Sequence, residues 1–227
     1  IHMHVESTML TPEEFGNAAV LCGTTAVFVD PHEIANVMGI PGVEYMLQNA
    51  RRSPVRQFNL ASSCVPSVPG LEGSGAKFGP GEIARMLDMD GVVGIAEVMD
   101  CVGVVNDTER MHGILEEGLR RGVLIQGHAP RVLGKELAAY ALGGPTDNHS
   151  GRSARECLEN LRAGLHVNLQ ASSLSSGSLP EMLNGLKGLR YHDNVSLCTD
   201  DVHAKDLLET GHINRILKKL IELGVDP

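Results

Sequence analysis

The 227 residues suffice for one α/β barrel, a fold of roughly 200–250 residues, and 42% of them are hydrophobic, which is ordinary for a globular core. A net charge of −9, no Lys/Arg cluster and no Trp argue against a nucleic-acid-binding protein, because such proteins need a basic surface and aromatic side chains for stacking. Five scattered Cys without a CxxC pair, and no apolar run near the ~20 residues of a membrane span, predict a cytoplasmic protein without a disulfide framework or a thiolate zinc site.

The first helix is predicted from its capping residues. Thr11 suits the N-cap, Pro12 suits the first helical position and Glu14 completes a capping box. Gly23 suits the left-handed residue that follows a helix. The segment Thr25–Asp30, which comes next, is almost continuously apolar and indicates a strand buried on both faces.

The same order of helix, glycine and apolar strand recurs along the chain. Helices are predicted from about Thr108 to Arg121, from Ser153 with Glu156 as its capping-box partner, and from His212 to Leu223. Eight segments with strand character alternate with helical ones: Ile1–Val5, Thr25–Asp30, Gln57–Cys64, Gly91–Val98, Gly122–Gln126, a weaker one near Ala141–Asp147, Leu165–Leu169 and Val195–Thr199.

This alternation predicts an α/β fold with parallel strands and right-handed crossovers. Eight units favour a closed (β/α)8 TIM-like barrel, while an open doubly wound sheet stays an alternative because no glycine-rich nucleotide loop decides between them. Ser67–Gly81 is predicted to be an active-site loop and Ser172–Ser178 a second, flexible loop. Because the chain opens at Ile1 without an initiator Met and stops at Pro227 within the pattern, we expect residues 1–227 to be the barrel fragment of a longer protein.

Residue types that bind metals recur where the predicted strands end. His2 and His4 alternate on the first strand, so both imidazoles face the same side and suit one cation. Glu97 lies at the end of an apolar strand, where a buried carboxylate needs a positive partner. The alternatives are two surface histidines on an edge strand and a structural salt bridge for Glu97.

Three more candidates follow later strands. His128 and His149 are predicted ligands because they occur in series with the others, although a single histidine after a strand is more often a capping or core residue. Asp200 follows the eighth strand, where a carboxylate can contact a metal and a nucleophilic water and transfer a proton; the alternative role, an N-cap, suits Asp201. We therefore predict one metal site with Glu97 and Asp200 as its catalytic carboxylates, and its ligands are His2, His4, Glu97, His128, His149 and Asp200.

Further polar residues follow the second and eighth strands. His32 and Glu33 lie directly after the second strand, and His203 lies just beyond Asp201. We predict that these three side chains bind the substrate, although Glu33 also suits the start of a helix.

Motifs along essentially the whole chain resemble one family. The segments HMHVES, DPHEIANVMG, SSCVP, GIAEVMD, GHAP, TDD-x-H and the terminal LLETGHINRILKKLIELGVDP are similar, in order, to the bacterial adenine deaminases of the amidohydrolase superfamily. DPHEIANV and TDD-x-H are quite specific to that family, whereas His-x-His alone marks the whole superfamily.

The resemblance implies a TIM-like barrel that binds two divalent metal ions, usually iron or manganese, although imidazole and carboxylate ligands also suit zinc. It implies that Glu97 bridges the two metals, where many members of the superfamily use a carboxylated lysine. The other five predicted ligands fall on the family's remaining ligand positions. A flanking β-rich segment and a C-terminal domain are expected beyond this chain, and barrels of this type often form homo-oligomers.

Two departures from the family pattern concern loops near the site. After the sixth strand the family usually has Ser/Thr-Asp-His-Glu, whereas this chain has Thr146-Asp147-Asn148-His149-Ser150, so the register of His149 is open. After the seventh strand the family tends to have Arg-Glu-Gly-Ser, whereas this chain has Gln170-Ala171-Ser172-Ser173.

The expected function is hydrolytic deamination of adenine to hypoxanthine and ammonia, a step of purine salvage. The expected partner is a small purine base, with no nucleic acid and no membrane. Because of the altered loops, a metal-dependent hydrolase of another amino-heterocycle or of a cyclic amide is the main alternative. A non-catalytic barrel subunit is a further one.

Overall fold

The structure is a computed structural model that describes residues 1–226; Pro227, the last residue of the predicted domain, lies outside the described residues. Paired strands in this part of the chain all run parallel and form two sheets, in the orders β1-β2-β3-β4 and β5-β6-β7. The strands are β1 (Ala26–Val29), β2 (Arg56–Ser62), β3 (Val92–Val98), β4 (Leu124–Gly127), β5 (Asp147–Asn148), β6 (His166–Gln170) and β7 (Val195–Cys198).

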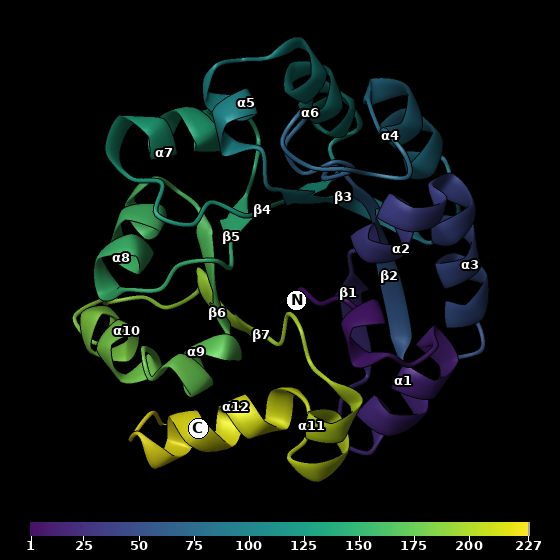
Figure 1. Ribbon diagram of the computed structural model, residues 1–227. Coiled ribbons are helices and arrows are strands. Elements are labelled where there is room, and N and C mark those ends of the chain that lie inside the picture. Colours follow the sequence, from purple (N-terminus) through teal and green to yellow (C-terminus); the bar gives the residue numbers. More distant parts are fainter. Residues whose placement is uncertain (227) are drawn as a thin grey trace.

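Helices connect successive strands and lie outside them (Figure 1), so the predicted α/β class with parallel strands is confirmed. A short 3-10 helix, η1 (Glu6–Thr8), precedes the α-helices. These are α1 (Pro12–Val20), α2 (His32–Met38), α3 (Ile40–Ala50), α4 (Pro80–Leu87), α5 (Cys101–Val105), α6 (Glu109–Arg121), α7 (Gly134–Leu142), α8 (Ala154–Arg162), α9 (Ser172–Ser176), α10 (Leu179–Leu186), α11 (Ala204–Glu209) and α12 (Ile213–Glu222).

The N-terminal segment lies between the two sheets. Met3 forms parallel bridges with Val29 at the end of β1 and with Asp200 after β7. On the opposite side, the backbone N–H of Thr146 donates to the carbonyl oxygen of Ile125 at 2.9 Å, which links β5 to β4. The strands therefore curl around a common centre. Of the predicted first strand, Ile1–Val5, only Met3 pairs with neighbouring strands on both sides.

The helix ends follow from the capping residues. Thr11 accepts a hydrogen bond from the Glu14 backbone N–H and Pro12 begins α1, as predicted. Ser153 accepts in the same way from the Glu156 backbone N–H at the start of α8. Gly122 ends α6 with a φ of 64°, a left-handed conformation that a side chain would strain.

Two predicted segments have a different structure. The predicted strand near Ala141–Asp147 was placed wrongly, because β5 contains only Asp147–Asn148. The helix α7 continues to Leu142, and Leu137 and Tyr140 form its buried face. The loop Ser172–Ser178 was also wrong, since its first five residues form the helix α9. The hydroxyl of Ser175 donates to the carbonyl oxygen of Ser172 within that turn, at 3.0 Å.

Apolar side chains fill the space between strands and helices. Ile95 of β3, Ile125 of β4 and Ile114 of α6 belong to one buried cluster. This packing holds the strands in register and leaves their carboxyl ends free to carry polar groups. Among residues 1–226, no helix combines the length and the apolar character that crossing a membrane requires.

Candidate metal centre

The N-terminal segment starts at the centre of the ring of strands in Figure 1, and His2 and His4 on this segment are 1% and 3% exposed. Nδ1 of His2 donates to Oε1 of Gln126 at 2.9 Å. Nδ1 of His4 donates to the backbone carbonyl of Asp30 at 2.9 Å. These bonds hold a proton on Nδ1 of each ring, so Nε2 is the nitrogen with the free lone pair in the neutral imidazole.

Asp200 joins these two histidines. The Nε2 atoms of His2 and His4 lie 3.2 Å apart, and Oδ1 of Asp200 lies 3.6 Å and 3.2 Å from them, respectively. Asp200 follows β7 with a φ of 56°, a region that residues other than glycine seldom adopt. Backbone strain of this kind is common at functional sites, where the surrounding structure maintains it.

Glu97 contributes a buried carboxylate from the end of β3 and is 3% exposed. Its Oε2 lies 2.7 Å from Nδ1 of His128 and 2.9 Å from Nε2 of His149, but neither contact is aligned as a hydrogen bond to it. Burial alone would raise the pKa of Glu97, but the adjacent His149 and His128 outweigh this and hold the pKa well below its ordinary value. The carboxylate is therefore ionised.

His128 and His149 follow β4 and β5. Nδ1 of His128 lies 3.1 Å from Nε2 of His149, and the His149 ring stacks on the His2 ring with centroids 4.0 Å apart. Burial, assisted by the adjacent His2, lowers the pKa of His149 to about 4. A neutral imidazole at this position offers a lone pair for ligation.

Asn148, the extra residue before His149, does not displace that histidine from the cluster. The Asn148 side chain accepts from the Ala129 backbone N–H at 3.1 Å and donates to Oδ1 of Asn160 at 3.0 Å. The insertion is thus used to bind the backbone that follows His128, and the ring of His149 still reaches Glu97.

These residues fit a centre for divalent cations. Imidazole nitrogens and carboxylate oxygens converge on one space, and Glu97 Oε2 and His149 Nδ1 are buried without a hydrogen-bond partner among residues 1–226. Three overlapping groups have potential ligand atoms that lie within 4.8 Å of one another inside each group: His2, Glu97 and His149; His2, His4 and Asp200; and His4, His32 and Glu97. Buried polar atoms without partners are costly in an empty site, and ligation removes that cost.

Asp30 is fully buried beside this cluster and was not predicted as a site residue. One of its carboxylate oxygens, Oδ1, accepts from the Ser62 hydroxyl at 2.6 Å. The other, Oδ2, accepts from the Glu97 backbone N–H at 2.7 Å and from Nδ1 of His32 at 3.0 Å. Asp30 therefore connects β2 and β3 to the start of α2 and orients two residues of the site.

Asp30, His32 and Cys64 form a further group of potential ligand atoms, but the group does not fit a third cation. Both carboxylate oxygens of Asp30 already accept hydrogen bonds. Burial raises the pKa of Cys64 to about 11, which keeps the thiol protonated and unsuited to ligation.

The three predicted substrate-binding residues lie in different surroundings. The His32 ring lies 4.3 Å from that of His4, centroid to centroid, and borders the cluster. Glu33 is exposed and its Oε1 lies 2.6 Å from the Ser7 hydroxyl. His203 is exposed at the N-terminus of α11, and within the described residues it makes no hydrogen bond to the cluster.

Two glutamines also contact the cluster and were not predicted. Gln126 accepts from His2, and Nε2 of Gln170 donates to Oδ2 of Asp200. Each is the last or next-to-last residue of its strand, and a polar residue ending an apolar strand is the sequence signal that could have indicated them.

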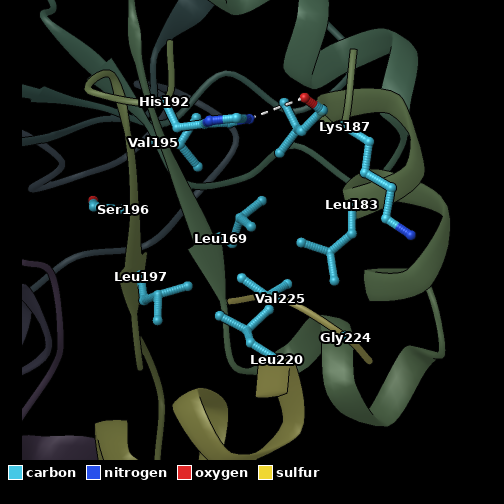
Figure 2. Close-up of a pocket in the computed structure, with 11 residues that line it drawn as sticks. Leu169, Leu183, Lys187, His192, Val195, Ser196, Leu197, Leu220, Gly224 and Val225 are labelled. Atoms are coloured by element: carbon cyan, nitrogen blue, oxygen red, sulfur yellow. Dashed lines mark hydrogen bonds between the residues drawn. The ribbon is translucent and has the colours of Figure 1, made fainter. Parts of the chain in front are cut away.

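An apolar cavity of about 380 Å³ lies elsewhere, between β6, β7, α10 and α12. Figure 2 shows Leu169, Leu183 and Leu220 around it, and His192 hydrogen-bonded at its edge. None of the predicted site residues lines this cavity.

Comparison with known proteins shows the family of the chain. The amidohydrolase family matches residues 1–222. The chain is 46% identical to the adenine deaminase of Serratia proteamaculans over 99% of its own length and 38% of that protein. It is 44% identical to the adenine deaminase of Klebsiella pneumoniae, over 99% of this chain and 37% of the relative. It is 41% identical to adenine deaminase 2 of Rhizobium etli, over 100% of this chain and 38% of the relative.

The chain therefore belongs to the amidohydrolase family. It spans about 38% of the length of these relatives.

Proposed function

We propose that this chain is the metal-dependent hydrolase barrel of an enzyme that converts adenine and water to hypoxanthine and ammonia. The observation that carries the proposal is a cluster of four imidazoles and two carboxylates at the carboxyl ends of parallel strands, in which all but His128 and Asp200 are fully buried. Identities of 41–46% to adenine deaminases, over nearly all of this chain, support adenine as the substrate.

We propose that the N-terminal segment and the seven strands form a closed (β/α)8 barrel. Support comes from the two bridges of Met3, to Val29 and to Asp200, and from the hydrogen bond between Thr146 and Ile125. In such barrels the site lies at the carboxyl ends of the strands, as the cluster does.

The proposed metal ligands divide into two groups that Glu97 joins. One contains His2, His4 and Asp200, and the other contains His128 and His149. These residues would hold divalent cations, which would supply the Lewis acidity that makes water a nucleophile at neutral pH. Iron or manganese is the expected pair from the family resemblance, and zinc also suits these ligands.

Asp200 is the proposed proton-transfer residue. The adjacent histidines lower its pKa despite burial, so it is ionised and can accept a proton from the attacking water. The same carboxyl group then donates that proton to the departing amine, which leaves C6 of the purine as ammonia. Glu97 holds the ligand groups together, while His32 borders the space in which the base would lie.

The test is ammonia release from adenine by the protein loaded with Mn²⁺, with hypoxanthine identified as the second product. A panel of guanine, cytosine and a cyclic amide is the comparison. Turnover of adenine above the others supports the proposal, and no ammonia from adenine would contradict it.

Another amino-heterocycle or a cyclic amide is the second candidate substrate. The observation that favours it is the loop after β6, where Gln170 contacts Asp200 and Ser172 contacts Gln170 in place of the expected Arg-Glu-Gly-Ser sequence. Preferential turnover of another member of the panel would select this candidate.

A further inference from the structure

Tyr140 is a fully buried residue of α7 whose hydroxyl lies between two strand ends. The hydroxyl donates to the carbonyl oxygen of Val98 at 2.6 Å. It accepts from the backbone N–H of His128 at 2.9 Å. A single phenolic oxygen therefore joins the end of β3 to the residue that follows β4.

This oxygen takes the place of an ordinary hydrogen bond between the strands. Val98 is paired with Gly127 in the parallel ladder, after a register irregularity that begins at Ile95. In a regular parallel pair the next hydrogen bond would run directly from the His128 N–H to the Val98 carbonyl. Here the hydroxyl accepts from one and donates to the other, so β3 and β4 are held apart by one oxygen atom at this point.

Gly127 supports the same arrangement. A Cβ atom there would lie 2.2 Å from the Asp147 carbonyl oxygen and 2.9 Å from the Tyr140 hydroxyl oxygen. Both distances are too short for a Cβ atom, so the residue at position 127, beside the hydroxyl, has to be glycine.

The strand ends that Tyr140 joins carry two of the six proposed ligands, Glu97 and His128. Glu97 immediately precedes Val98, and Oε2 of Glu97 lies 2.7 Å from Nδ1 of His128. We infer that Tyr140 is a positioning residue for the proposed metal centre, because its hydroxyl sets the separation from which Glu97 and His128 reach a shared cation. The inference rests on the proposed function in that it requires the cluster to bind metal.

The variant Tyr140→Phe keeps the buried ring and removes only the oxygen. The Val98 carbonyl and the His128 N–H then lose their buried partner. Either the strand ends close on each other or both groups stay unpaired, and both responses change the position of His128 relative to Glu97.

The experiment is a titration of the metal-free protein with Mn²⁺ against a competing chelator, together with the electron paramagnetic resonance spectrum. We expect the wild-type protein to bind two ions with the spectrum of a coupled pair. We expect Tyr140→Phe to bind one of the two ions about 10–100-fold more weakly. At intermediate Mn²⁺ concentrations its spectrum should then show the signal of a single uncoupled ion.

Two control variants separate positioning from general loss of stability. Tyr45→Phe removes a hydroxyl from a 46% exposed tyrosine on α3 and should leave both affinities unchanged. Leu137→Val removes one methylene from a residue that is 1% exposed and lies on α7, the same helix as Tyr140. This variant should lower the melting temperature without weakening the binding of either ion. Equal loss of metal affinity in Leu137→Val and Tyr140→Phe would overturn the inference.

The remaining outcomes distinguish this inference from the proposed function. Wild-type affinity and spectrum in Tyr140→Phe would overturn the inference alone. A wild-type protein that binds two ions but releases no ammonia from adenine would leave the inference supported and contradict only the substrate. A wild-type protein that binds no Mn²⁺ would overturn both.

Discussion

The Nε2 atoms of His2 and His4 lie 3.2 Å apart, although the Nδ1 proton of each ring is held by a separate acceptor. Two imidazole lone pairs that face each other at this distance repel unless a positive charge lies between or beside them. Burial opposes protonation of these rings, but Asp200 and Glu97 outweigh it and raise the pKa of both His2 and His4. A divalent cation bound among these residues would supply the positive charge in place of the protons.

We predict that the Gln126 acceptor is required for tight metal binding. Gln126→Met keeps the side-chain length but removes the oxygen to which His2 donates, so the His2 ring is free to rotate or change tautomer. Metal affinity should fall about 10–100-fold in a chelator titration. Gln57→Met, at a glutamine that instead donates to the Pro12 carbonyl, is the control and should bind metal normally.

Asp200→Asn should separate metal binding from turnover. The amide keeps the shape of the side chain but cannot take a proton from water, so kcat should fall about 10²–10⁴-fold while elemental analysis still finds bound metal. The exposed neighbour Asp201→Asn should retain activity. Turnover near the wild-type level in Asp200→Asn would show that another group moves the proton.

Asp30 should make a large contribution to stability. Asp30→Asn replaces a carboxylate that accepts from Ser62, Glu97 and His32 with an amide that has one acceptor oxygen. The free energy of unfolding, measured with urea, should fall by about 3 kcal/mol. Ser62→Ala removes only one of these donors and should cost about 1 kcal/mol; equal losses in the two variants would contradict the role assigned to Asp30.

His212 should make stability depend on pH. Burial, assisted by the charge of Arg215, lowers the pKa of His212 from 6.5 to about 4. The unfolded chain therefore takes up a proton at a higher pH than the folded protein does. The stability contributed by the neutral ring, roughly 3 kcal/mol at most, is fully present above about pH 6.5 and is lost as the pH falls toward about 4.

The matching variant is His212→Gln, which can still hydrogen-bond to Thr24 or Thr199 but does not titrate. The difference in unfolding free energy between variant and wild type should shrink as the pH falls from 6.5 to 4. Parallel stability curves across that range would be evidence against the lowered pKa.

The α/β class and the gathering of the six ligand candidates could be predicted from sequence, because the carboxyl ends of parallel strands meet at one edge of a sheet. A residue such as Glu97 or His128 needs only to follow an apolar strand to be placed there. Their assignment as metal ligands and catalytic groups stays a prediction.

The supporting contacts could not be predicted in the same way. The bond from His2 to Gln126 joins residues 124 positions apart, and it depends on the orientation of one amide. Tyr140 forms part of an apolar helix face, and no periodicity distinguishes a core tyrosine from one whose hydroxyl separates two strands. The weak strand near Ala141–Asp147 was placed wrongly because helix and strand patterns overlap in short apolar segments.

The most direct test of the metal centre is an anomalous-difference map from a crystal of the protein grown with Mn²⁺. We predict two peaks, one among His2, His4 and Asp200 and one beside His128 and His149, with Glu97 in contact with both. A map without a peak at this cluster, or with bound ions only at other positions, would contradict the account.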